Sequence, residues 1–229
     1  MARDAAEAMN SMIAGQDRPS PARTARDGPG HNARMPASPS GRPVRPATIR
    51  TARLDLVPLR VEHADAMSRV LDDPALHTFI GGAPEDTDAL RARYRRVLAG
   101  SPDPGVSWCN WVIGLRAEDG APLVGTVQAT VVPGAPGSVA EIAWVVGTAW
   151  QRRGIATEAA RGLVDWLAWQ GVRTVVAHVH PDHGASAAVA AAAGLAATDT
   201  VQDGEIRWQS PPDGTPGGGR CGISRGGRP

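Results

Sequence analysis

The sequence predicts a mixed α/β fold, in which strand-like and helix-like segments alternate through one core of roughly 160 residues. Apolar residues make up 42% of the 229 residues, which is enough for a sizeable core. The hydrophobic spacing also switches repeatedly between the period of a strand and that of a helix. We expect one domain over residues 47–210, a disordered tail rich in Pro, Ser and Arg over residues 1–46, and a flexible Gly-rich tail over residues 211–229.

The first half of the core begins with a strand and two helices. Residues 48–59 alternate apolar and polar side chains, which predicts one strand. Residues 61–73 carry apolar residues at helical spacing, and residues 84–100 start with acids and end at a glycine, as helices do. Strands are expected at 106–116 and 122–132, because an Asp-Gly pair between them indicates a hairpin.

The second half continues the alternation. Residues 139–147 have the pattern of a strand, and a helix is predicted after it over residues 151–170. A strand at 173–180, a short alanine-rich helix at 184–195 and a closing strand at 204–209 complete the order. An antiparallel meander followed by helix, strand, helix and strand is a mixed α/β arrangement.

The composition excludes several functional classes. A net charge of +1 gives no basis for binding nucleic acid or a membrane surface. The two cysteines, Cys109 and Cys221, form neither a disulfide framework nor a metal-site spacing, and they fit a reducing compartment. The N-terminus has no apolar core of signal-peptide length, and no stretch is long enough to span a bilayer. We therefore expect a soluble, cytoplasmic protein.

The start of the helix at 151–170 is the most informative position. Two arginines and Gly154 open it, in place of the Ser or Asp that usually begins a helix. The first turn of a helix has backbone N–H groups without intrahelical partners, and the helix dipole adds partial positive charge. Gly154 has no Cβ to block a phosphate, Ala156 is small, and Thr157 adds a hydroxyl donor. These features predict an anion site; the alternative is a plain strand-to-helix turn with solvated arginines.

At this turn the sequence resembles a known family. The letters QRRGIA fit the Gln/Arg-x-x-Gly-x-Gly/Ala signature of the GNAT superfamily of acetyl-CoA-dependent N-acetyltransferases. The preceding AEIAWVVGTAW resembles its fourth strand, and HPDHGASAAVAAAAGL resembles its second cofactor segment, Asn-x-x-Ser followed by Gly-Phe or Gly-Leu. The opening TARLDLVPLRVEHADAM resembles the Rim-type branch, which acetylates ribosomal-protein N-termini. The resemblance covers about residues 48–209 and implies the GNAT fold, a mostly antiparallel sheet flanked by helices.

The resemblance implies a site for acetyl-CoA. It places the backbone of Val146 against the pantetheine arm, in a gap between the fourth and fifth strands, with its N–H near the thioester carbonyl. Ser186 follows His183 in the family's register, and His183 stands where the family has Asn, so that contact is open because histidine is bulkier and titrates. The pyrophosphate would lie against Gln151, Arg152, Arg153, Gly154, Ile155, Ala156 and Thr157.

Acetyl transfer to an amine needs a base, because free alkyl amines are mostly protonated at neutral pH. Glu141 is our candidate, on the strand face opposite Ile142 and Trp144; alternatively it only positions the amine or lies at a solvated strand end. The family's usual acid, a tyrosine in the last helix, is replaced by Ala190. Ser186 is the candidate partner of the CoA thiolate, and a helix-start cap is the alternative.

Other residues favour structural roles. Trp108 and Trp111 can line an acceptor pocket, but we expect core packing for at least one of them. The histidines near residue 180 have no carboxylate or cysteine partner elsewhere, so no metal is expected. A contact with the 3′-phosphate of CoA or with an acidic partner is possible for one arginine group, but we expect a solvated helix face for Arg91, Arg93, Arg95 and Arg96.

These observations together predict an N-acetyltransferase that moves acetyl from acetyl-CoA to a primary amine by direct attack through a tetrahedral intermediate. The acceptor is open between a protein N-terminus, a polyamine-like metabolite and an amine-bearing antibiotic, and the protein between a monomer and a homodimer. The alternative is a non-catalytic acyl-CoA-binding or sensing module, which the absent tyrosine and His183 favour. A nucleotide-binding α/β protein is the third possibility.

Overall fold

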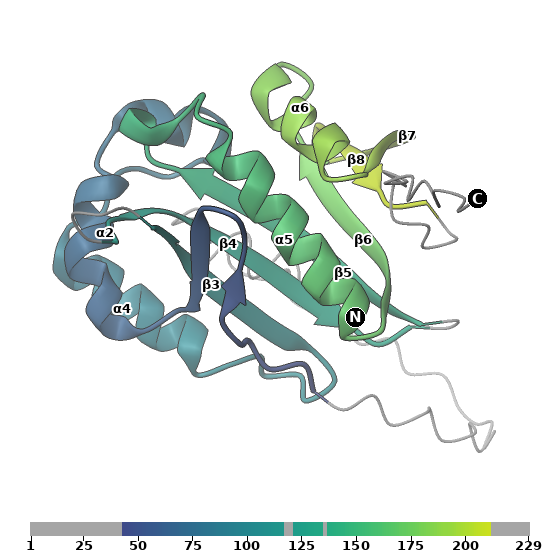
Figure 1. Ribbon diagram of the computed structural model, residues 1–229, viewed down its shortest axis with the longest axis horizontal. Helices are drawn as coiled ribbons and strands as arrows, with labels where there is room; N and C mark the ends of the chain where they lie inside the picture. The colour runs from purple at the N-terminus through teal and green to yellow at the C-terminus, as the bar shows by residue number, and fades with distance from the viewer. Residues whose placement is uncertain (1–42, 117–120, 135–136, 212–229) are drawn as a thin grey trace, which may run out of the picture.

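An eight-stranded sheet forms the centre of the computed structural model, which describes residues 43–116, 121–134 and 137–211 (Figure 1). Within these ranges the strand order is β1-β2-β3-β4-β5-β6-β8-β7, and every neighbouring pair is antiparallel except β5 with β6. The predicted mixed α/β class with a mostly antiparallel sheet is therefore confirmed. The strands are β1 (Ile49–Arg50), β2 (Leu54–Pro58), β3 (Ser107–Leu115), β4 (Leu123–Val132), β5 (Ser138–Val146), β6 (Val172–Val179), β7 (Ala196–Gln202) and β8 (Glu205–Gln209).

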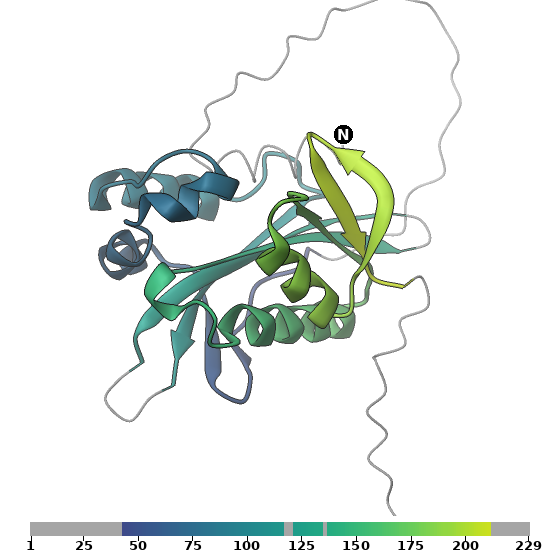
Figure 2. The ribbon, with the colours of Figure 1, turned by 90° about the horizontal axis from the view of Figure 1, so that it is seen from above.

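Helices lie on both sides of the sheet. Figure 2 shows α5 on one side and α2 and α4 on the other. Short 3-10 helices precede α2, α3 and α5 along the chain. The helices are η1 (Val61–His63), α2 (Ala64–Val70), η2 (Pro74–Leu76), α3 (His77–Ile80), α4 (Thr87–Leu98), η3 (Thr148–Trp150), α5 (Ile155–Trp169) and α6 (Gly184–Ala192).

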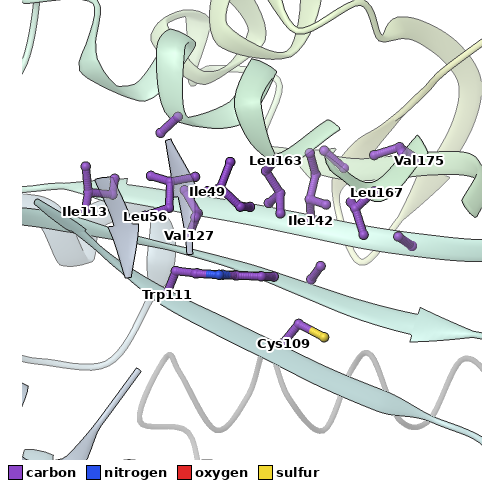
Figure 3. Packing of buried hydrophobic residues seen from close by; sticks show 14 of the residues in the cluster. Ile49, Leu56, Cys109, Trp111, Ile113, Val127, Ile142, Leu163, Leu167 and Val175 are labelled. Carbon is purple, nitrogen blue, oxygen red and sulfur yellow. The ribbon is translucent and has the colours of Figure 1, made fainter. Parts of the chain in front are cut away.

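The main core lies between α5 and the sheet (Figure 3). Trp111 of β3 is fully buried there, meets Trp166 of α5 edge-on at a ring distance of 5.2 Å, and donates its Nε1 proton to the carbonyl of Ala47 at 2.8 Å. The predicted apolar stripe of α5 is confirmed, except that Ala156 is only partly buried. The buried residues of α5 are Ile155, Ala159, Ala160, Leu163 and Leu167.

A second cluster joins α2 and α4 to the opposite face of the sheet. The expectation of a solvated arginine face on α4 is wrong for Arg93, which is 9% exposed and pairs with Glu85 at 2.7 Å. A buried guanidinium requires such a partner, and Glu85 precedes the helix, so helical periodicity does not reveal the pair. Arg91 is partly buried and ion-paired, whereas Arg95 and Arg96 are exposed.

The predicted strand at 48–59 is wrong as a single strand. Residues 51–53 form a turn, and β1 folds back on β2 with Ile49 opposite Leu56. Arg116, distant in sequence, donates to backbone carbonyls of this turn. Alternation alone cannot show such a turn, because its stabilising partners come from other parts of the chain.

Further differences concern short elements and boundaries. The sequence did not predict η2, α3 or β7, and the predicted hairpin turn between β3 and β4 lies mostly outside the described residues. Val44 falls within the predicted tail, yet it is partly buried against the core and its N–H donates to Ser107 Oγ at 3.0 Å. The rest of that tail up to residue 42, and residues 212–229, lie outside the described ranges.

Candidate active site

Strands β5 and β6 separate halfway along their length. They pair in parallel from Ser138 only as far as Glu141, which lies opposite Val176. Beyond this point β5 continues to Val146, whereas β6 pairs with β8 on its other side. Figure 1 shows the two strands side by side at one end and apart at their C-terminal ends.

The backbone of Val146 faces this separation. The N–H of Gly147 donates to the carbonyl of Val124 at 2.9 Å, so Val146 and Gly125 form a non-hydrogen-bonded pair of the β4–β5 ladder. The N–H and C=O of Val146 therefore point away from β4, toward the side that β6 has left. The carbonyl accepts a hydrogen bond from Gln151 Nε2 at 3.0 Å, which ties the following turn to the end of the strand.

The turn after β5 leads to the N-terminus of α5. Gly154 is the N-cap, with φ 74° in the left-handed region that favours glycine, and no side chain caps the helix. The first backbone bond of the helix runs from the N–H of Glu158 to the carbonyl of Gly154 at 3.0 Å. The amides of Ile155, Ala156 and Thr157 therefore precede the first intrahelical donor, as an anion site requires.

The two arginines of this turn are exposed, but they differ in conformation. Arg152 has φ 60°, a strained value for a residue with a side chain. Arg153 lies over the ring of Trp150, 4.9 Å from its centroid, as a cation–π pair. Both side chains lie beside the free end of α5, where they add positive charge.

A third arginine, which sequence reasoning missed, supports the turn from the β1–β2 hairpin. Arg53 donates to the carbonyl of Arg153 at 3.1 Å and to Glu158 Oε2 at 2.7 Å. Glu158 also accepts from the backbone N–H of Arg53 and from Thr51 Oγ1, each at 2.6 Å. Burial alone would raise the pKa of Glu158, but these donors outweigh it and lower the pKa. A resemblance centred on residues 151–157 carries no signal for this partner.

A hollow of about 800 Å³ adjoins the same turn on the hairpin side of α5. It begins at Gly154 and Thr157 and runs along the helix past Arg161 to Trp169. Because Gly154 and Thr157 lie at its end, this hollow extends the anion site rather than the face that carries Glu141.

Glu141 lies on the face of β5 opposite the α5 core, as the alternation predicted. Its neighbours Ala140 and Ile142 are buried in that core, whereas Glu141 is partly exposed. Oε1 of Glu141 lies 2.9 Å from Nδ1 of His178 on β6, whose side chain is 10% exposed. Nε2 of His178 is buried and has no hydrogen-bond partner among the described residues. Sequence reasoning did not select His178, although its strand period places it on this face.

Glu205, at the start of β8, belongs to the same polar face. Burial raises the pKa of its carboxyl, and Glu141 raises it further, while His178 and His180 oppose the shift. Two carboxylates and two histidines are therefore gathered beside the separation of β5 and β6. Glu205 has no sequence signal, because its place depends on the return of β8 beside β6.

The two tryptophans of β3 lie on opposite faces. Trp111 is in the α5 core, which agrees with the expectation of core packing for at least one of them. Trp108 shares the row of Glu141, because β3 pairs Trp108 with Thr130 and β4 pairs Thr130 with Glu141. Its Nε1 is buried without a hydrogen-bond partner among the described residues, so Trp108 is the one available to an acceptor.

The second cofactor segment lies at the start of α6. His183 is the N-cap residue without a side-chain cap bond, and its ring stacks on Phe79 of α3 at a ring distance of 4.2 Å. Burial and the nearby His180 lower the pKa of His183, which favours the neutral ring. Ser186 is the third residue of α6 and not its N-cap, so the helix-start alternative for this serine is wrong.

No tyrosine occupies the position of the family's usual acid. Ala190 is fully buried in the α5 core. The chain's one tyrosine, Tyr94, is buried in α4, and burial raises its pKa to about 12. Within the described ranges, no cluster of three or more His, Cys, Asp or Glu residues is arranged to hold a metal ion, and none of the helices is long and apolar enough to cross a membrane.

A mostly antiparallel sheet that opens beside a bare helix N-terminus, with a polar face next to the opening, defines a mixed α/β acyltransferase. The family comparison agrees, since the model of the GNAT acetyltransferase domain matches residues 53–196. The chain belongs to this family. Among curated proteins, no sequence matches it significantly.

Solved structures share the fold. An acetyltransferase from Agrobacterium tumefaciens has 27% sequence identity and a TM-score of 0.53, over 79% of this chain and 98% of its own. RimL, a ribosomal-protein alpha-N-protein acetyltransferase in complex with coenzyme A, has 17% identity and a TM-score of 0.59, over 71% and 97%. A spermidine N-acetyltransferase chimera from Vibrio cholerae and hSSAT has 15% identity and a TM-score of 0.54, over 69% and 95%.

Proposed function

We propose that this protein transfers an acetyl group from acetyl-CoA to a primary amine. The observation that carries the proposal is the separation of β5 from β6, with the Val146 peptide directed into it and the free amides of α5 at its end. An extended thioester with a pyrophosphate matches both parts, because an amide can pair with the pantetheine arm and a helix N-terminus binds phosphate. A cytoplasmic location, where CoA thioesters and free amines meet, belongs to the same proposal.

The proposed cofactor contacts follow the positions given by the sequence. The N–H of Val146 lies where it can polarise the thioester carbonyl and stabilise the oxyanion. His183 and Ser186, at the start of α6, are proposed to contact the cofactor, and Ser186 to receive the CoA thiolate. The pyrophosphate is assigned to Gln151, Arg152, Arg153, Gly154, Ile155, Ala156 and Thr157, with Arg53 beside them.

The proposed acceptor site is the polar face of the sheet. Glu141 supplies the basic charge that a protonated amine requires before it can attack, and Trp108 lies in its row. The acceptor is a protein N-terminus or a small-molecule amine; RimL and the spermidine N-acetyltransferase, which share the fold, act on one of each kind. Acetyl transfer occurs by direct attack of the amine, without a covalent enzyme intermediate.

A non-catalytic acyl-CoA-binding module is the second candidate, because Ala190 replaces the family's acid. The test is thiol release from acetyl-CoA by the full chain, with a panel of N-terminal peptides, polyamines and aminoglycosides. We expect release with at least one amine, and a loss of about 100-fold or more in kcat for Glu141→Gln with acetyl-CoA binding kept. Glu62→Gln, an exposed carboxylate outside the site, is the matched control. Binding without release for every amine would favour the non-catalytic module.

A further inference from the structure

His178 and Glu141 meet at the point where β5 and β6 separate. Their 2.9 Å contact joins Nδ1 of the ring to Oε1 of the carboxylate. An ionised carboxylate offers only acceptor sites, so the shared proton belongs to Nδ1 and the lone pair of the ring lies on Nε2. Glu141 thereby fixes both the tautomer and the orientation of His178.

The Nε2 atom is then a basic nitrogen with nothing bound to it. It is buried and has no hydrogen-bond partner among the described residues. Buried polar atoms are nearly always paired in folded proteins, and an exception calls for a functional reason. The same face holds a second such atom, Nε1 of Trp108, in the row of Glu141. Two unpaired polar atoms on the proposed acceptor face suit a polar ligand that binds there.

We infer that Nε2 of His178 is the atom that takes the proton from the acceptor amine, and that Glu141 is the positioning residue that holds the ring. This inference rests on the proposed function and narrows its base from a carboxylate to one nitrogen. Glu141 is already bound to the ring through Oε1, whereas Nε2 has a free lone pair, so the amine proton has its acceptor on His178.

The atoms of the step balance. Nε2 accepts a proton from the amine, and the amine nitrogen forms a bond to the thioester carbon. The C–S bond breaks with its electron pair on sulfur, which leaves as the CoA thiolate. The proton held on His178 then neutralises the thiolate, directly or through water, so that amide and CoA are the products and the ring is restored. This return of the proton accounts for an active site without the family's tyrosine.

The charged groups around His178 determine how the step depends on pH. Glu141 on β5 and Glu205 on β8 favour a proton on the ring. Arg207, the direct cross-strand neighbour of His178 on β8, and His180 on the same strand oppose it. An imidazole base loses activity as the pH falls through about 7 to 6, whereas a carboxylate base remains active to about pH 4.5. The profile must use kcat/KM for the neutral form of the amine, because protonation of the amine adds its own slope.

The experiment compares His178→Gly, His178→Gln and Glu141→Gln in the full chain, with His63→Gln, a histidine on η1, as control. We expect both His178 variants to lose about 100-fold or more in kcat while the KM for acetyl-CoA changes little. Added imidazole should restore part of the activity of His178→Gly but not of Glu141→Gln, which keeps its own ring. A structural role for His178 predicts no such rescue.

A second measurement is independent of whether the variants fold. Nitrogen-15 chemical shifts of the histidine rings in the wild-type protein should show His178 protonated at Nδ1 and bare at Nε2 near pH 8. A proton on Nε2, or a His178→Gln variant that keeps kcat within about twofold, overturns the inference and leaves Glu141 as the direct base. The proposed function fails separately: a wild-type protein that binds acetyl-CoA but releases CoA with no amine removes both.

Discussion

Glu158 ties the cofactor turn to the β1–β2 hairpin through three donors, so its charge contributes to stability. Its pKa is lowered in the folded chain, hence the contribution is full above the unfolded value and is lost as the pH falls through the folded value. We expect Glu158→Gln to lower the free energy of unfolding by about 1–2 kcal/mol at pH 7, since bonds to a charged group are replaced by weaker ones. Urea unfolding at pH 7 and below about pH 4.5 measures the difference.

The two proteins should converge in stability at the acid end, because there the wild-type carboxyl is also neutral. Glu62→Gln, at an exposed position on η1, is the control and should change the free energy of unfolding at neither pH. A Glu158→Gln variant that is equally destabilised at both pH values would instead indicate lost packing.

Residue-scale prediction worked where a side chain's place follows from local period. The face of Glu141 follows from alternation along one strand, and the structure shows it. His178 shares that face by the same rule, but its contact with Glu141 depends on the parallel register of β5 and β6, which lies outside any local pattern. Glu205 and Arg53 depend on still longer-range pairings. The catalytic role of Glu141 stays a prediction.

At the scale of elements, the two ends of α5 provide a matched test of the anion site. Gly154 begins the helix at φ 74° and Gly171 follows its end at φ 83°, so alanine at either position costs about 1–2 kcal/mol in left-handed strain. Only Gly154→Ala places a methyl group at the phosphate site, where its Cβ would also lie 3.4 Å from Nη2 of Arg53. We expect acetyl-CoA affinity to fall about tenfold, or ~1.4 kcal/mol, for Gly154→Ala alone.

Calorimetric titration with acetyl-CoA and thermal unfolding of both variants separate the two effects. The Cβ of an alanine at 171 meets nothing within 4 Å, so Gly171→Ala reports the strain without the ligand. Equal losses of affinity in both variants would mean that the binding defect comes from a weakened helix and not from the turn.

Long periodic elements were predictable and short ones were not. The strands β3, β4, β5 and β6 and the helices α4, α5 and α6 lie where their patterns placed them, within a few residues. The β1–β2 turn was missed because Arg116 and Glu158 stabilise it from elsewhere in the chain. The strand β7 is mostly exposed and polar at the edge of the sheet, so no hydrophobic alternation identifies it.

At the scale of the whole molecule, the ligand site is a consequence of topology. β6 is held by β5 on one side only as far as Glu141 and by β8 on the other, so the sheet opens without losing the pairing of either strand. The opening divides a bare helix end from a polar face, and these two surfaces differ in charge. A molecule that joins an anionic group to a reactive carbonyl fits across them, with the acceptor amine on the polar side.

Acetyl-CoA should therefore stabilise the fold as a whole, because it contacts β5, the turn and the start of α6 only when all three are assembled. At a concentration of about 100 times Kd, binding adds about 2.7 kcal/mol, which raises Tm by about 5–10 °C for a domain of this size. Thermal unfolding with acetyl-CoA, with ATP and with a Gly154→Glu variant is the measurement. We expect the shift for acetyl-CoA alone, and its loss in the variant, because a glutamate at the N-cap repels the pyrophosphate. An equal shift with ATP would indicate a general nucleotide site, and no shift with a folded wild-type protein would exclude acetyl-CoA as its ligand.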